Sequence, residues 1–150
     1  MDALRAEVED REFTPLPDEV GPVRQGAEEL VVALGDPNLP VMAQLARALR
    51  RAVVGAGSDL GFRRYQPQEA SYLRYRGPGD GFSPHRDAKR YVLLVAIFTL
   101  VGRAPFRVVA DRAGGQVLAS WLTVPGDLCL LRAPRLGGEA EGRPCVAPAW

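Results

Sequence analysis

A histidine and an aspartate two positions apart are the side chains in this sequence best suited to chemistry. The segment 82–87 (FSPHRD) contains His85, the only histidine among 150 residues, and Asp87. Residues two apart in a strand point to the same face, so an imidazole nitrogen and a carboxylate oxygen are expected to converge there. They would supply two ligands of an iron site that takes two histidines and one carboxylate.

The spacing alone is weak support for a metal site. The H-x-D pattern occurs often by chance, and a lone histidine is more often a surface or hydrogen-bonded residue than a ligand. The sequence contains no second histidine to complete such a site. The elements that surround the pair must therefore decide how the pattern is interpreted.

Near residue 60 the sequence changes from a helical to a strand-rich character. A helix is predicted over 41–54 and an earlier one over 25–34. We therefore expect a helical N-terminal layer over 1–60 and a β-rich core over 61–150, within a single domain. The predicted helix over 41–54 has apolar residues at helical spacing: Val41, Leu45, Leu49 and Val53.

Short segments typical of strands follow residue 60, with Gly- and Pro-rich turns between them. The apolar run 91–101 is best interpreted as a buried central strand and is too short to span a bilayer. Several strands after a helical lead favour a sandwich or barrel, jelly rolls included. The tail 137–150 has little pattern. The predicted strands are 70–76, 91–101, 106–111, 117–124 and 128–131.

The order of these features over 60–134 resembles the 2-oxoglutarate- and Fe(II)-dependent oxygenase superfamily, and is most similar to AlkB-like and related bacterial members. The resemblance implies an α+β fold in which N-terminal helices pack on a double-stranded β-helix (jelly roll) that is incomplete at its C-terminal end. The matching segments, in order, are 72–76 (YLRYR), 77–81, 84–87 (PHRD), 92–102 and 125–132 (PGDLCLLR).

The resemblance implies that His85 and Asp87 are iron ligands, with Fe(II) as the metal and 2-oxoglutarate as co-substrate of a dioxygenase whose substrate is unidentified. Tyr75 falls where AlkB-like members often carry a tyrosine that hydrogen-bonds 2-oxoglutarate. Their partner asparagine two residues earlier is replaced by Leu73 in this sequence. A packed strand aromatic is an equally good interpretation of Tyr75.

The family also carries a distal histidine after the PGD strand, and then an arginine that pairs with 2-oxoglutarate. The segment 142–145 (GRPC) resembles the approach to that histidine, but neither residue follows it. Three interpretations stay open. The chain is a truncated or frame-shifted oxygenase, or a degenerate, non-catalytic binding or interaction module, or another residue completes the site. The candidates for that residue are Cys145, Asp127, Glu139 and Glu141.

A β-helix that lacks its last strands is expected to leave an open, apolar sheet edge. Solubility would then depend on a partner, on a dimer, or on cover from the N-terminal helices. The oligomeric state does not follow from the sequence.

The charge balance places few limits on partners. The net charge of +1 does not by itself call for nucleic acid or an anionic membrane. Nucleic acid is conceivable as a partner because of the arginines, but solvated arginines on a helix face and loop are the favoured interpretation. The arginines concerned are Arg47, Arg50, Arg51, Arg63, Arg64, Arg74 and Arg76.

Cysteine usage and the N-terminus both favour a cytoplasmic protein. Cys129 and Cys145 form neither a C-x-x-C motif nor a metal-finger spacing, so no disulfide framework is predicted. The first residues are charged and lack the apolar stretch of a secretory signal.

Overall fold

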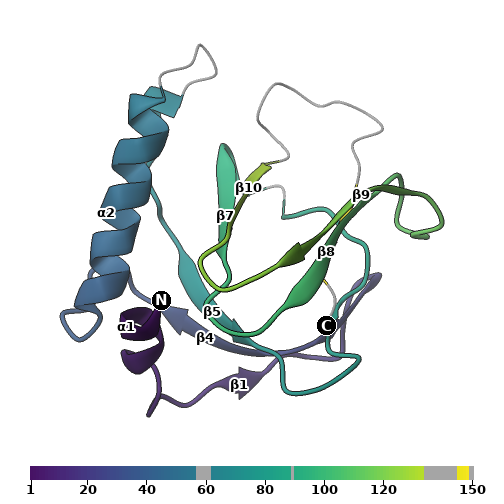
Figure 1. Ribbon diagram of the computed structural model, residues 1–150, viewed down its shortest axis with the longest axis horizontal. Coiled ribbons are helices and arrows are strands. Elements are labelled where there is room, and N and C mark those ends of the chain that lie inside the picture. Colours follow the sequence, from purple (N-terminus) through teal and green to yellow (C-terminus); the bar gives the residue numbers. More distant parts are fainter. Residues whose placement is uncertain (57–61, 89, 134–144, 149–150) are drawn as a thin grey trace.

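The computed structural model describes residues 1–56, 62–88, 90–133 and 145–148, the last of these as backbone only (Figure 1). The described residues form a mixed α and β fold in which strands predominate, and their sheets do not close into a barrel. Two helices are present, α1 (Asp2–Ala6) and α2 (Pro40–Gly55), with a 3-10 turn η1 (Phe62–Arg64). Neither helix has the length and apolar character needed to cross a bilayer, within this part of the chain.

Eleven short strands make four small sheets among the described residues, in the orders β1-β4-β5, β2-β3-β6, β10-β7 and β11-β8-β9. Every pairing is antiparallel. The strands are β1 (Thr14–Pro15), β2 (Glu19–Val20), β3 (Val23–Gly26), β4 (Glu28–Val32), β5 (Ala70–Arg74), β6 (Gly81–Phe82), β7 (Leu94–Phe98), β8 (Ala104–Val109), β9 (Val117–Thr123), β10 (Leu128–Arg132) and β11 (Cys145–Pro148).

The helix predicted over 25–34 is wrong, because this segment forms β3 and β4. A two-residue turn at Gly21 and Pro22 joins β2 to β3, and Gly21 has a φ of 56°, a conformation that glycine adopts without strain. β4 pairs along its whole length with β5, and β3 pairs with β6. Residues 1–60 are therefore not a purely helical layer, since their strands share sheets with strands that follow residue 60.

The other predicted elements are present with shifted ends. α2 covers the helix predicted over 41–54, and β5, β8, β9 and β10 lie within two residues of their predicted bounds. The run 91–101 contains a shorter strand, β7. The prediction that the tail 137–150 has little regular structure is wrong at 145–148, where β11 pairs with β8. The rest of the tail, 137–144 and 149–150, lies outside the described residues.

The strands β7 to β10 pair in a nested order. β8 and β9 form a hairpin, and β7 and β10, which flank that hairpin in the sequence, pair with each other. The two pairs lie in separate sheets, so the chain folds over itself between them (Figure 1).

A small apolar core lies where the helices meet the first sheet. Val8, Val32, Leu39 and Tyr72 are buried together, and the helices line one side of the strands (Figure 1). A second group of buried residues belongs to β8 and its neighbours, with Phe106 and Val109 nearly inaccessible. By contrast, every residue of β7 is only half-buried.

The N-terminus of α2 is capped by a side chain from far earlier in the chain. The residue before α2 is Leu39, which has no side-chain acceptor. The carboxylate of Glu7 instead accepts hydrogen bonds from the backbone N–H groups of Val41 and Met42 in the first turn. These are two of the four N–H groups that a helix leaves without an internal partner, and a negative charge is favourable at that end. Glu7 thus fastens α2 to the segment that follows α1.

Replacing this cap should weaken the fold. We expect Glu7→Ala to lower the free energy of unfolding by about 1 kcal/mol, the typical cost of losing a helix cap, in chemical denaturation. Glu9→Ala is the matched control, because the Glu9 carboxylate is 64% exposed and lies 3.9 Å from Arg5 in a surface pair of little expected value. Equal effects of the two substitutions would contradict the capping role.

The hydroxyl of Tyr72 is buried without a hydrogen-bond partner among the described residues. Its burial, together with the nearby charge of Glu7, raises the pKa of Tyr72 to about 12. A buried polar atom without a partner destabilises a fold, so we expect Tyr72→Phe to leave the free energy of unfolding unchanged or to raise it by about 1 kcal/mol. A clear loss of stability in urea denaturation would show that the hydroxyl has a partner.

Candidate metal site

The backbone of the β3–β6 pair holds the segment that carries His85. Gln25 pairs with Phe82, and beyond this pair the N–H of Ser83 donates to the carbonyl of Arg24 at 2.9 Å. The N–H of Arg24 in turn donates to the Ser83 hydroxyl oxygen at 2.9 Å. These bonds fix the chain two residues before His85.

The loop before β6 is closed by one carboxylate. Oδ2 of Asp80 accepts the N–H of Arg76 at 2.7 Å and the N–H of Gly77 at 3.1 Å. The loop predicted over 77–81 is confirmed up to Asp80, and Gly81 already belongs to β6. Asp80 thus holds the turn that connects β5 to β6.

The structure brings the two sequence-predicted ligands together. Nε2 of His85 lies 4.0 Å from Oδ1 of Asp87, and the two side chains are only 17% and 18% exposed. Nδ1 of His85 lies 2.8 Å from the carbonyl oxygen of Ser83. Because a carbonyl oxygen only accepts, Nδ1 is the donor in this contact, and Nε2 is the ring nitrogen that faces Asp87 and could bind a metal.

The pair was expected on a strand, but it lies in a loop. His85 forms an isolated bridge after β6, and Arg86 and Asp87 have no strand structure. The turn of the β8–β9 hairpin packs against this loop. A Cβ added at Gly114 would lie 3.1 Å from Cγ of Pro84, and the φ of Gly114 is 71°, so glycine fits best at this contact.

The surroundings of Asp87 disfavour an uncompensated charge. Burial raises the pKa of this carboxyl group above its usual value, and the neighbouring His85 acts in the opposite direction. A carboxylate removed from water is stabilised by a cation placed against it. The donor set fits a divalent metal, since an imidazole nitrogen and a carboxylate oxygen face each other.

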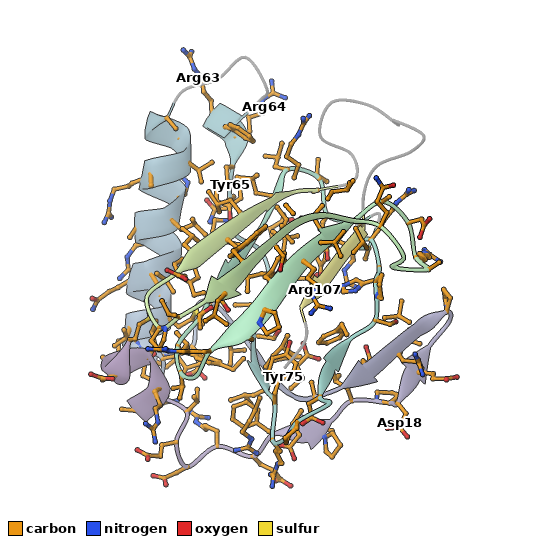
Figure 2. The ribbon with its side chains drawn as sticks, turned by 45° about the vertical axis from the view of Figure 1, so that its right-hand side comes forward. Asp18, Arg63, Arg64, Tyr65, Tyr75 and Arg107 are labelled. Carbon is orange, nitrogen blue, oxygen red and sulfur yellow. The ribbon has the colours of Figure 1, made fainter. Side chains whose placement is uncertain are left out.

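Tyr75 is connected to His85 through one aromatic ring. The rings of Tyr75 and Phe82 meet edge to face with centroids 6.2 Å apart, and Phe82 lies 5.6 Å from the imidazole of His85. Tyr75 is half-buried, just after β5 (Figure 2). Its place supports both sequence interpretations, because a packed aromatic and a residue near the metal pair would each make this contact.

Glu28 holds the end of β5 and was not anticipated from the sequence. Its carboxylate contacts Nε of Arg74 and Nε of Arg76, each at 2.7 Å, and its side chain is 14% exposed. The Arg74 guanidinium also lies 4.1 Å above the ring of Phe13. These contacts flank Tyr75 in the sequence and fix the strand end that carries it. No local pattern marks Glu28, because its partners are more than 40 residues away.

The other proposed ligands do not join His85 and Asp87 among the described residues, where no group of three metal-binding side chains occurs. Oδ2 of Asp127 accepts the N–H of Val124 at 2.9 Å within the turn before β10. Glu139 and Glu141 lie outside the described residues. Cys145 begins β11, opposite Val109 of β8, and only its backbone is described.

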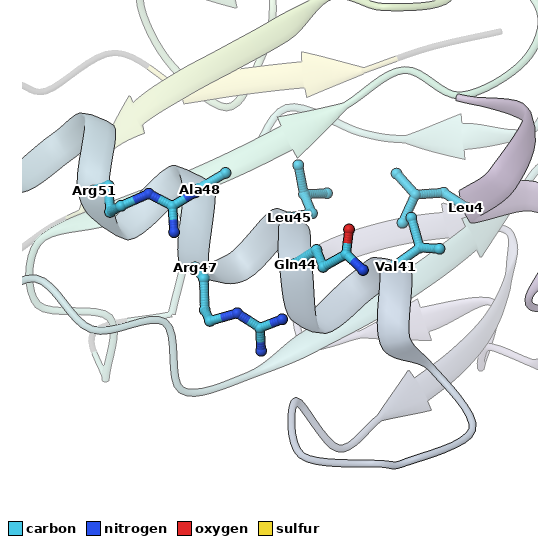
Figure 3. Close-up of a pocket in the computed structure, with 7 residues that line it drawn as sticks. All are labelled: Leu4, Val41, Gln44, Leu45, Arg47, Ala48 and Arg51. Atoms are coloured by element: carbon cyan, nitrogen blue, oxygen red, sulfur yellow. The ribbon is translucent and has the colours of Figure 1, made fainter.

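Two shallow grooves lie elsewhere, and neither is lined by His85, Asp87 or Tyr75. The first, of about 430 Å³, lies along α2 and is closed at one end by Leu4 of α1 (Figure 3). Arg47 and Arg51 stand beside its apolar lining, which has no carboxylate, histidine or cysteine. This groove lacks the groups that acid–base or metal chemistry needs.

The arginines considered in the sequence do not form one surface. Arg74 and Arg76 are paired with Glu28, whereas Arg63 and Arg64 project from η1, well away from Tyr75 in Figure 2.

No family model matches the chain, and no curated protein or solved structure is significantly similar to it.

The ion pairs of Glu28 should make stability depend on pH. The hydrogen bond from Arg76 is the main cause that lowers the pKa of Glu28 below its usual 4.5, helped by Arg74 and opposed by burial. A lowered folded-state pKa stabilises the fold above about pH 4.5, and this contribution is lost as the pH falls through the folded-state value. We expect Glu28→Gln to reduce stability at neutral pH and to flatten the acid limb of the stability curve.

Thermal denaturation between pH 7 and pH 3 measures this effect. Glu29→Gln is the matched control, because Glu29 is the next residue of β4 and has no ion pair in the part of the chain that the structure describes. If both variants follow the wild-type pH profile, the ion pairs of Glu28 do not contribute to stability.

Proposed function

We propose that the chain binds Fe(II) through His85 and Asp87 and belongs to the 2-oxoglutarate-dependent oxygenases, acting on a substrate that its described residues do not identify. The observation that supports this most strongly is the hydrogen bond between Nδ1 of His85 and the Ser83 carbonyl. Metal-binding histidines almost always donate their second ring N–H in this way, which orients the ring and fixes the free nitrogen.

The spacing of the donor atoms is compatible with a metal. Two ligand bonds of about 2.1 Å can join atoms up to about 4.2 Å apart, and adjacent ligands at a right angle stand about 3 Å apart. The 4.0 Å between His85 and Asp87 is within that limit.

The nested strand order supports a jelly roll as the finer description of the fold. A jelly roll forms when a long antiparallel hairpin folds over itself, so that outer and inner strand pairs enter different sheets. The outer pair β7–β10 and the inner pair β8–β9 have this relation, and β11 extends the inner sheet. On this scaffold the metal pair follows β6, which contacts β11.

The chain's own residues have distinct tasks in this proposal. His85 and Asp87 hold the metal, which supplies oxygen activation when bound. Ser83 orients the imidazole through its carbonyl. Tyr75, placed by the Glu28 contacts, is the candidate hydrogen-bond donor to 2-oxoglutarate. The Phe82 ring lies between Tyr75 and His85 and contacts both.

Anaerobic Fe(II) titration followed by calorimetry tests the metal pair. His85→Ala and Asp87→Ala each remove one ligand, so we expect each to weaken binding by more than the 10- to 100-fold typical of losing an orienting partner. Asp18→Asn is the control, since Asp18 is an exposed aspartate just before β2 and is not one of the two proposed ligands. Wild-type binding no tighter than that of His85→Ala would refute the proposal.

Conversion of 2-oxoglutarate to succinate, measured with and without Fe(II), tests the reaction. We expect Fe(II)-dependent succinate formation that His85→Ala abolishes and Tyr75→Phe reduces, with the Michaelis constant for 2-oxoglutarate raised. Metal binding without succinate formation would instead favour the alternative function, a non-catalytic binding or interaction module on the same scaffold.

A further inference from the structure

β9 is an edge strand with an unusually exposed set of side chains. In the sheet β11-β8-β9 its only partner among the described residues is β8, so its other edge presents unpaired N–H and C=O groups. Six of its seven residues are exposed, and only Thr123 is buried. The large apolar residues on it have these exposed fractions: Val117 50%, Leu118 52%, Trp121 39% and Leu122 55%.

This edge lacks the features with which proteins usually protect one. Lysines, prolines and inward-pointing charges normally discourage pairing at an exposed edge. β9 has none of them, and the whole stretch 113–126 carries no charged residue. Other outer strands differ, since β1 contains Pro15 and β5 ends in the ion-paired Arg74. β7 is also uncharged, but its residues are half-buried.

β9 itself carries no charge that would select an acidic or a basic strand, although Arg107 of β8 lies beside its centre. An uncharged strand suits a second copy of itself, which places no charge directly opposite β9. A two-fold axis perpendicular to a continuous sheet leaves each side chain on the same face of the sheet. Directly opposite residues of an antiparallel pair also share a face, and alternate residues of a strand point to opposite faces. The axis must therefore lie where one residue faces its own symmetry mate, and not midway between two residues. The centre of the seven-residue strand is Ser120. Only an axis at Ser120 pairs all seven residues of β9 with the partner strand.

That register is complementary in size as well as in polarity. It places Leu118 opposite Leu122 of the second copy, and Trp121 opposite Ala119, a large side chain against a small one. Ser120 faces its own symmetry mate across the axis. The Trp121 ring stacks on Phe106 of β8 with centroids 5.1 Å apart and an interplanar angle of 25°, which holds this large side chain on one face of the sheet. No like charges meet along the strand.

We propose that β9 is a dimerisation strand, which pairs antiparallel with β9 of a second copy about a two-fold axis at Ser120. The two three-stranded sheets then become one of six strands, and main-chain hydrogen bonds together with the covered apolar side chains supply the affinity. This inference is independent of the metal site, because it uses none of the residues that hold the metal.

Charge substitution at Ser120 tests the register, with mass measured by light scattering over a range of protein concentrations. We expect the wild type to approach twice its 16.3 kDa. Ser120→Lys puts two like charges directly opposite each other, so we expect at least a tenfold weaker dimer. Ser120→Glu should act in the same direction, but less strongly, because Arg107 lies beside Ser120 on β8 and can offset the new charge (Figure 2).

An equimolar mixture of the Lys and Glu variants should restore the dimer, since opposite charges then face each other across the axis. Ser71→Lys is the matched control, because Ser71 is an exposed serine on β5 of a different sheet. It should dimerise like the wild type. A monomeric wild type at all concentrations, or a dimer that Ser120→Lys leaves intact, would overturn the proposal.

Hydrogen exchange on the unaltered protein provides a second test that does not depend on the variants folding. Half of the β9 amides point away from β8, and dimerisation should slow their exchange at least tenfold between dilute and concentrated protein. Exchange at these amides that does not change with concentration would overturn the proposal.

Discussion

The pairing of residues 23–28 with residues 74–83 is the constraint on which the candidate site depends. β3 holds β6 and Ser83 through backbone bonds, while Glu28 holds the end of β5 through two arginines. Tyr75 and the His85 loop are thereby tied to one short stretch of chain. The contacts that position the site therefore join residues that are far apart in the sequence. Because closing such long loops is entropically unfavourable, burial and charge pairing must offset that cost.

The second organising feature is that the strands β7 to β10 are only partly covered by other elements of the fold. The nested hairpin buries Phe106 and Val109 but leaves β7 half-buried and β9 largely exposed. A sheet needs another layer over its apolar face, and a contiguous exposed apolar surface usually marks an interaction site. The exposed edge at β9 has a different origin from the open edge expected from the sequence, which was attributed to missing last strands of a β-helix.

The sequence predicted the elements that local interactions determine, and it failed where partners far along the chain determine the structure. α2 was predictable because its apolar spacing is local, and the later strands because β-branched runs alternate with Gly and Pro turns. Residues 25–34 were mistaken for a helix because their strand state is decided by partners near 72 and 82. The proximity of His85 and Asp87 was predicted from strand geometry, but a loop achieves it, with the Ser83 carbonyl setting the ring.

The hairpin β8–β9 contacts the proposed metal site and also carries the exposed edge strand. Its turn touches the metal-pair loop at Gly114 and Pro84, while its outer strand is the exposed edge. A hairpin with one free edge is weakly held, because most of its stability comes from packing against neighbours. Cover on β9 would therefore also steady the turn that supports Pro84. As the proposed metal ligands, His85 and Asp87 would need a fixed backbone, since a metal tolerates little error in ligand position. The hairpin that has an open edge among the described residues is thus also the one that would have to be rigid for the proposed site.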